Sequence, residues 1–199
     1  MSRIKLCGLR RACDIEYANE LKPEYVGFVF ARDSRRYVSS EHAELLRKEL
    51  DSGIVPVGVF VDEDPGRIAA LLKRNVIAAV QLHGSEDEEY INILRSLTDC
   101  SIIKAFRIGS EADIAAAGRC TADFVLLDSG GGTGKSFDHS LIANMHRNYF
   151  LAGGLGPDNV GEAVRTLAPY GVDASSGLET DGCKDRDKMT AFVRAVREA

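Results

Sequence analysis

The sequence predicts an α/β fold: a (β/α)8, or TIM, barrel of minimal size that occupies residues 1–199 as a single domain. Three observations support this prediction. Short apolar segments alternate with amphipathic segments along the chain, which is typical of strand–helix units. The apolar segments lack the apolar–polar alternation of half-exposed strands, as expected for parallel strands covered on both faces. Eight such units share 199 residues, close to the lower limit of about 200 residues for this fold.

Eight apolar segments are the predicted strands, and most of them end about 21–25 residues apart. The interval between the second and the third is longer. A turn and then a helical pattern follow each segment, so the repeat is one strand–helix unit. The predicted strands are residues 4–7, 25–30, 55–61, 78–82, 102–106, 124–127, 149–152 and 171–174.

Capping residues predict where several of the helices begin. Ser39 and the Asp64-Pro65 pair are typical helix starts, because a Ser or Asp side chain caps the first turn and Pro fits its first position. Ser85 and Ser110 each open a Ser-x-x-acid pattern, which is typical of a capping box.

The remaining helix signals lie toward the C-terminus. Gly156-Pro157 opens one helix, and residues 140–145 give a weaker signal for another. The last helix shows apolar residues at helical spacing, which predicts a face packed on the barrel. That face consists of Met189, Phe192, Val193 and Val196.

Composition and charge narrow the classes of function. The net charge is −5 and no block of like charge occurs, so nothing favours nucleic acid or an anionic membrane as a partner. Five cysteines without a C-x-x-C pattern do not make a disulfide framework and fit a reducing cytoplasm. No apolar run approaches the roughly 20 residues of a membrane span. The four histidines form no metal-ligand pattern, so we expect no metal.

Because active sites of this fold lie at the C-terminal ends of the strands, the residues after each apolar segment are the candidates for chemistry. Cys7-Gly8 ends the first strand, and Gly8 allows a sharp turn beside a ligand. Cys7 has two interpretations. Its thiol either faces the site or is a small buried apolar group, and no partner for a thiolate is evident from this strand alone.

Asp128 follows the sixth apolar segment directly and precedes a glycine-rich loop. A carboxyl group at the apolar mouth of a barrel suits general-acid chemistry, because desolvation favours its protonated form; the alternative is an Asp that caps the loop. The glycines of residues 130–134 predict a mobile lid. The loop nearly matches the nucleotide-binding pattern G-x-x-x-x-G-K-[ST], but Ser129 stands at the leading position, which disfavours nucleotide hydrolysis.

Small residues after the seventh and eighth strands predict a phosphate site. Gly153 and Gly154 follow one strand, and Ser175 and Ser176 follow the other. Barrels of this fold often bind phosphate there, through backbone N–H groups and the N-terminus of a short extra helix. Residues 177–183 have room for such a helix.

Four other polar residues stand at or near strand ends. Arg36 either clamps a carboxylate through two hydrogen bonds or lies on the solvated surface. Asp173 lies within the eighth strand, where an ionised carboxylate needs a partner. Gln81 lies inside the fourth strand, and His83 after it either contacts a ligand or makes a hydrogen bond at the rim.

A set of short motifs runs in order from residue 5 to residue 179. The motifs are Lys5-Leu6-Cys7-Gly8-Leu9, Gly27-Phe28-Val29-Phe30, Ser34-Arg35-Arg36-Tyr37-Val38, Val59-Phe60-Val61, Gln81-Leu82-His83-Gly84, Asp128 with Gly132-Thr133-Gly134-Lys135-Ser136-Phe137-Asp138, Leu151-Ala152-Gly153-Gly154-Leu155, and Val172-Asp173-Ala174-Ser175-Ser176-Gly177-Leu178-Glu179. Together they resemble the phosphoribosylanthranilate isomerase family of tryptophan biosynthesis. His139 departs from the family pattern, which usually has Trp there.

The resemblance implies an Amadori rearrangement of a phosphoribosyl anthranilate without a cofactor. It implies that Asp128 is the general acid and Cys7 the general base. Arg36, Gln81, His83 and Asp173 are assigned to substrate binding, with Arg36 on the anthranilate carboxylate. The phosphate site is assigned to Gly153, Gly154, Ser175 and Ser176.

Two other functions stay open from the sequence. The chain could be another phosphosugar-binding barrel enzyme, such as an epimerase, although such enzymes are expected to use lysine, paired carboxylates or a metal at the strand ends. It could also be a phosphate-binding barrel without catalysis, in which Cys7 is an ordinary buried thiol. We expect a cytoplasmic monomer, with a homodimer as the alternative.

Overall fold

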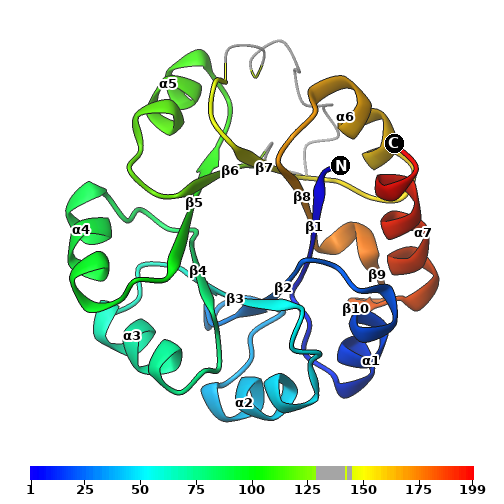
Figure 1. Cartoon of the computed structure of the whole chain (residues 1–199), viewed down its shortest axis with the longest axis horizontal. Helices are drawn as coiled ribbons and strands as arrows, with labels where there is room; N and C mark the ends of the chain where they lie inside the picture. The colour runs from blue at the N-terminus through cyan, green and yellow to red at the C-terminus, as the bar shows by residue number, and fades with distance from the viewer. Residues whose placement is uncertain (129–141, 143–144) are drawn as a thin grey trace.

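The computed structural model describes residues 1–128, 142 and 145–199. Its eight parallel strands close a barrel in sequence order, and the helices form a ring around it (Figure 1). This closed ring confirms the predicted (β/α)8 fold. The strands are β1 Arg3–Cys7, β2 Tyr25–Val29, β3 Val55–Phe60, β4 Ala79–Leu82, β5 Ser101–Arg107, β6 Phe124–Asp128, β7 Tyr149–Ala152 and β8 Gly171–Ala174.

Nine of the sixteen strand ends match the prediction and the other seven differ by one residue, and one of these differences concerns the site. Asp128 is the last residue of β6 and pairs with Ala152 of β7, so the sheet itself fixes its backbone. The predicted lid at residues 130–134 and four of the six residues of the weak helix at 140–145 lie outside the described residues.

Seven α-helices occur in the described part of the chain. Ser39 and Asp64 cap α2 and α3 as predicted, since their side chains accept hydrogen bonds from His42 N and Arg67 N. The buried face of α7 is also confirmed. The helices are α1 Ala12–Leu21, α2 Ser40–Glu49, α3 Pro65–Lys73, α4 Glu88–Leu97, α5 Glu111–Arg119, α6 Val160–Leu167 and α7 Arg186–Arg197.

Two predicted helix starts and one predicted capping box need correction. Asp87, not Ser85, caps α4, because the Asp87 carboxylate lies one residue before the helix and accepts from Tyr90 N. Ser110 holds the N-cap position of α5 without a side-chain cap; its hydroxyl instead donates to Asp113 at 2.8 Å. The helix predicted at Gly156-Pro157 starts only at Val160, because the 156–159 turn closes first.

The barrel interior is filled at its N-terminal end and open at its C-terminal end. Side chains alternate along each strand, so every second residue points inward. Phe150 plugs the lower interior and packs edge-on against Tyr25, with ring centroids 5.5 Å apart. Above this layer lie Cys7, Val29 and Val59, at the ends of their strands. The C-terminal face therefore has room for a ligand over a packed floor.

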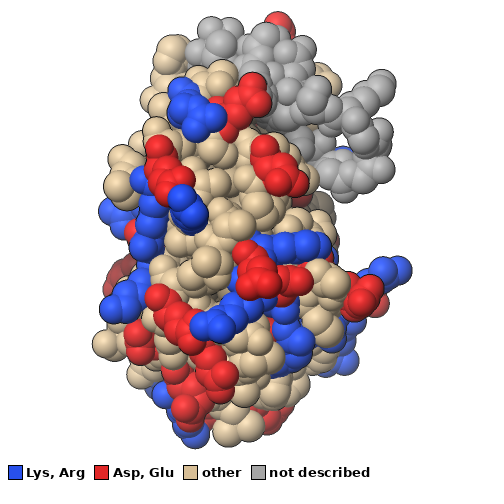
Figure 2. Space-filling model, turned by 90° about the vertical axis from the view of Figure 1, so that its right-hand side faces the viewer, with Lys and Arg blue, Asp and Glu red and all other residues tan. Residues whose placement is uncertain are grey.

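Between β8 and α7 the chain makes a small excursion over the rim of the barrel. It consists of a 3₁₀ helix, η2 Ser176–Leu178, followed by a hairpin of β9 Glu179–Thr180 and β10 Cys183–Lys184. A short helix thus occurs close to the predicted segment 177–183, one residue earlier. Figure 2 shows acidic and basic side chains interspersed over one face of the molecule. No helix among the described residues is both long and apolar enough to cross a membrane.

Candidate active site

A cavity of about 340 Å³ opens at the C-terminal ends of the strands. Its walls come from seven of the eight strand ends and the loops that follow them, with an apolar patch of Val29, Ala31, Val59, Val61 and Leu155. All ten residues that the sequence marks for the site line this one cavity. They are Cys7, Arg36, Gln81, His83, Asp128, Gly153, Gly154, Asp173, Ser175 and Ser176.

Cys7 reaches the cavity because two glycines make space around it. A Cβ on Gly27 of the neighbouring strand would lie 2.6 Å from the Cys7 sulfur, too close for any side chain. Gly8 turns the chain with φ +80°, in the left-handed region that favours glycine. Cys7 is only 7% exposed yet lines the cavity, so both sequence interpretations of this thiol describe part of what is observed.

The electrostatics of Cys7 combine two opposing effects. Burial raises the pKa of the thiol, while the positive charges of Lys5 and Lys184 act to lower it. The net direction in the empty site is upward, which favours the thiol form. A cationic group arriving next to the sulfur would favour the thiolate.

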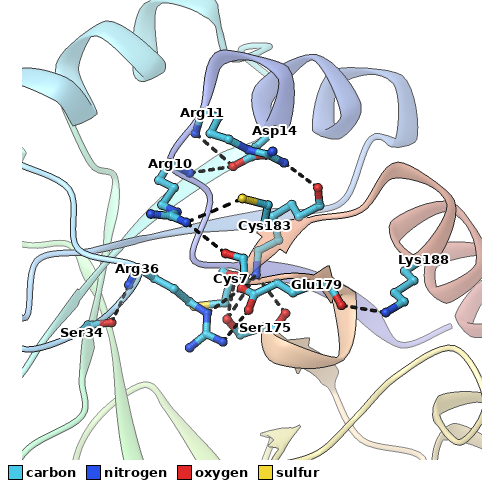
Figure 3. Close-up of polar contacts among 12 residues, drawn as sticks. Cys7, Arg10, Arg11, Asp14, Ser34, Arg36, Ser175, Glu179, Cys183 and Lys188 are labelled. Atoms are coloured by element: carbon cyan, nitrogen blue, oxygen red, sulfur yellow. Dashed lines mark hydrogen bonds and ion pairs between the residues drawn. The ribbon is translucent and has the colours of Figure 1, made fainter.

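Arg36 projects from the loop after β2 toward Glu179 on the rim excursion (Figure 3). Its Nε and one terminal nitrogen donate to the two carboxylate oxygens at 2.6 and 2.7 Å. Since a guanidinium has five N–H groups, three remain for a ligand. The sequence interpretation of Arg36 as solvated surface is therefore wrong, because its side chain is largely covered and held by an ion pair.

Glu179 links Arg36 to the end of β1 through a network of hydrogen bonds. Its carboxylate also accepts from the buried Lys184 ammonium at 2.6 Å. Burial alone would raise the pKa of Glu179, but hydrogen bonds from Arg36 and Lys184 outweigh it and lower the pKa to about 2. Lys184 further donates to the Ser175 carbonyl at 2.9 Å, and the Ser175 hydroxyl donates to the Cys7 carbonyl at 3.0 Å. The network ties the rim to the end of β1.

His83 lies between Gln81 and Asp128. Gln81 Nε2 donates to His83 Nδ1 at 2.9 Å, so in this amide orientation the imidazole proton is on Nε2. That nitrogen is 3.7 Å from an Asp128 oxygen. Burial lowers the pKa of His83, although the Asp128 charge opposes this, so the ring is neutral near pH 7. Gln81 Oε1 is buried and has no hydrogen-bond partner among the described residues, so it is an acceptor that a ligand could use.

The loops after β7 and β8 form the remaining wall. Gly153 and Gly154 both have positive φ, at +94° and +64°. Gly177 packs so closely on the first loop that a Cβ there would lie 2.1 Å from the Leu155 carbonyl oxygen. Backbone N–H groups of such turns and of a helix start form a suitable anion site.

Sequence reasoning missed three charged residues of this site: Lys5, Glu179 and Lys184. Lys5 lies inside the barrel, fully buried, with its ammonium 2.9 Å from Asp173. Its signal was available, because Lys5 stands two positions before Cys7 and therefore on the same face of the strand. Glu179 belongs to a motif but had no assigned role, and Lys184 lies in no motif at all.

Three comparisons with known proteins give one consistent result. The model of the PRAI family, N-(5'-phosphoribosyl)anthranilate (PRA) isomerase, matches residues 4–195. An N-(5'-phosphoribosyl)anthranilate isomerase from Acetivibrio thermocellus is 44% identical over 213 residues, which cover 100% of this chain and 97% of that protein. The crystal structure of phosphoribosyl anthranilate isomerase from Thermotoga maritima is 36% identical, with a TM-score of 0.90 and full coverage of both chains. A crystal structure of this enzyme type in complex with reduced 1-(o-carboxyphenylamino)-1-deoxyribulose 5-phosphate is 34% identical, with a TM-score of 0.88 and the same coverage. The chain therefore belongs to the N-(5'-phosphoribosyl)anthranilate isomerase family.

Proposed function

We propose that this protein converts N-(5-phosphoribosyl)anthranilate into 1-(2-carboxyphenylamino)-1-deoxyribulose 5-phosphate, an Amadori rearrangement in tryptophan biosynthesis. The observation that carries the proposal is that a thiol, Cys7, and a carboxyl group, Asp128, line one cavity from different sides. They stand on β1 and β6, which β7 and β8 separate around the ring. A substrate between them can receive a proton on one side and lose one on the other.

In the first step Asp128 acts as the general acid. It donates its proton to the ring oxygen of the ribose while the bond between that oxygen and C1 breaks. The lone pair of the anthranilate nitrogen forms the C1=N bond, which gives an open-chain iminium ion. A proton delivered in this way typically contributes about 10²–10⁴-fold to the rate.

In the second step Cys7 acts as the general base. Its thiolate takes the proton from C2, the C1=C2 bond forms, and the electron pair of the C=N bond moves onto nitrogen to give an enolamine. The positive iminium lies next to the sulfur at this stage and favours the thiolate. The enolamine then loses the proton of its C2 hydroxyl and gains one at C1, which yields the ketone. No cofactor is required, because the iminium nitrogen accepts the electrons.

The rest of the cavity is suited to the two charged ends of the substrate. The free N–H groups of Arg36 fit the anthranilate carboxylate, and the apolar wall around Val29 and Val59 fits the aromatic ring. The loops at Gly153, Gly154, Ser175 and Ser176 fit the phosphate. Gln81, His83 and Asp173 line the same cavity, where hydroxyl groups of the sugar would meet them.

The loss of phosphoribosylanthranilate fluorescence, measured with purified protein, tests the proposal. We expect first-order decay that depends on enzyme concentration and yields the deoxyribulose product by mass spectrometry. No acceleration above the uncatalysed rate would exclude the isomerase and favour a phosphate-binding barrel. Conversion of a different phosphosugar instead would favour another enzyme of this fold.

The monomeric state and the cytoplasmic location stay predictions from the sequence. Light scattering on the purified chain distinguishes the monomer from the homodimer. Fractionation of the source cells tests the location.

A further inference from the structure

Lys5 is the most unusual buried residue of this barrel. It lies fully inside the ring, on the inward face of β1, and ranks among the largest completely buried side chains of the described structure. The register pairs it directly with Asp173 of β8, and its ammonium donates to Asp173 Oδ1 at 2.9 Å. The next inward residue of the same strand is Cys7.

Stability alone does not account for a charge in this position. Removing an ammonium and a carboxylate from water costs several kcal/mol for each ion, and replacing a buried pair by apolar residues is often neutral or stabilising. The layer below is already a packed apolar plug around Phe150. An apolar residue at position 5 would have continued that packing.

The charged groups around Cys7 indicate a role for the Lys5 ammonium in stabilising a thiolate. Three cations act on the Cys7 sulfur: Lys5 from β1, Lys184 from β10 and Arg36 from the loop after β2. Against them stand the Asp173 and Glu179 carboxylates. This set of described residues therefore carries one positive charge in excess, which a Cys7 thiolate would neutralise.

Lys5 differs from the other two cations in its contacts. Arg36 and Lys184 both donate to the Glu179 carboxylate, whose negative charge reduces the positive potential that they exert at the sulfur. Lys5 has Asp173 as its carboxylate partner instead, and its positive charge is the largest effect that lowers the pKa of Cys7 against the effect of burial. Asp173 has the opposite influence and raises the pKa of Cys7.

We propose that Lys5 is a positioning residue for the general base: its buried ammonium, fixed by Asp173 on the adjacent strand, holds and stabilises the Cys7 thiolate. The iminium of the bound substrate then adds a further cation beside the sulfur and completes the shift from thiol to thiolate. This inference rests on the proposed isomerase function, in which Cys7 is the base.

Alkylation of Cys7 by iodoacetamide, followed by mass spectrometry of the peptide that contains it, measures the thiolate directly. The peptide readout separates Cys7 from the other four cysteines, Cys13, Cys100, Cys120 and Cys183. The rate is recorded from about pH 6 to 10 for the wild type, Lys5→Met and Asp173→Asn. No substrate is needed, so this result is independent of the isomerase assay.

The two variants have opposite expected results. Lys5→Met moves the midpoint of the pH–rate curve upward, because the thiolate loses a stabilising cation. Alkylation at pH 7.5 slows at least about threefold, because the thiolate fraction is smaller. The greater nucleophilicity of the more basic thiolate offsets part of this loss. Asp173→Asn removes the carboxylate but leaves the ammonium, so the midpoint moves downward. A purely structural pair would lower the melting temperature in both variants without displacing the two midpoints in opposite directions.

Loss of Lys5 alone leaves the Asp173 carboxylate unpaired and can prevent folding. In that case the double variant Lys5→Met/Asp173→Asn is measured, in which no buried charge is left unpaired. The midpoint of the double variant is compared with that of Asp173→Asn alone. A higher midpoint supports the proposal. An unchanged midpoint in folded protein overturns it, whether or not wild-type protein turns over phosphoribosylanthranilate.

Discussion

The Arg36 guanidinium is held by the Glu179 carboxylate through two hydrogen bonds of 2.6 and 2.7 Å, although the two residues are 143 positions apart. The pairing fixes a long, flexible side chain before any ligand arrives. Such pre-organisation reduces the entropy that binding must otherwise overcome. It also leaves one edge of the guanidinium for a second carboxylate.

Replacing Arg36 with Ala should raise KM about tenfold to a hundredfold, with a smaller effect on kcat. A charge-assisted hydrogen bond contributes roughly 1.5–3 kcal/mol, and the carboxylate that Arg36 would bind is remote from the reacting carbons. Steady-state kinetics with phosphoribosylanthranilate measure both constants. An unchanged KM would remove Arg36 from carboxylate binding.

Glu179 should make a contribution to stability that disappears in acid. Its pKa is lowered from 4.5 to about 2 in the folded protein, so the carboxylate stabilises the fold at pH values above its unfolded pKa. The contribution is at most about 3 kcal/mol and is lost as the pH falls from about 4.5 toward 2. Glu179→Gln should therefore melt at a lower temperature than the wild type at pH 7.

The difference between these two proteins should narrow steadily as the pH is lowered below about 4.5. Thermal melts of both proteins across this range provide the test, and a constant difference would contradict the assignment. Glu198→Gln is a suitable control, because the Arg194–Glu198 pair lies exposed on the last helix and contributes little.

The strand–helix repeat predicts the barrel. The rule that active sites lie at the C-terminal ends of the strands predicts where the site residues stand in the sequence. Cys7 and Asp128 could be found in this way because each stands at the end of an apolar segment, and Arg36 because it lies in the loop that follows one. Glu179 could not, since its partner Arg36 becomes a neighbour only when the barrel closes. Lys5 was missed for another reason. It lies within β1, two residues before the end of the strand, where the sequence interpretation expected only apolar residues.

The start of α4 shows a similar limit of local patterns. Ser85 fits a capping box, but its hydroxyl donates to Asp62 on the preceding strand-end loop, and Asp87 takes the cap. The competing contact comes from 23 residues away, so a four-residue pattern cannot reveal it.

Cys7→Ser and Asp128→Asn should each lower kcat by about 10²-fold or more while the protein still folds. A serine hydroxyl is too weak a base at neutral pH, and an asparagine amide cannot deliver a proton. Both replacements preserve size and change only the group that transfers the proton. Single-turnover kinetics and circular dichroism provide the test, and near-normal turnover in either variant would remove that residue from the mechanism.

Gly27→Ala should damage catalysis although it replaces no reacting group. The new methyl would lie 2.6 Å from the Cys7 sulfur and 3.1 Å from its Cα, and since the Cα belongs to a barrel strand, the thiol must rotate away. We expect kcat to fall by at least about tenfold, because small displacements of a catalytic group are costly. The pH–rate curve of Cys7 alkylation should change as well.

Gly118→Ala is the matched control for this variant. Gly118 lies on the exposed side of α5, where an added Cβ meets nothing within 4 Å. There the substitution should leave kcat unchanged and stabilise the helix by up to about 1 kcal/mol. If Gly27→Ala instead kept full activity, the Cys7 thiol would not need the position it occupies against β2, and base catalysis from that position would have to be given up.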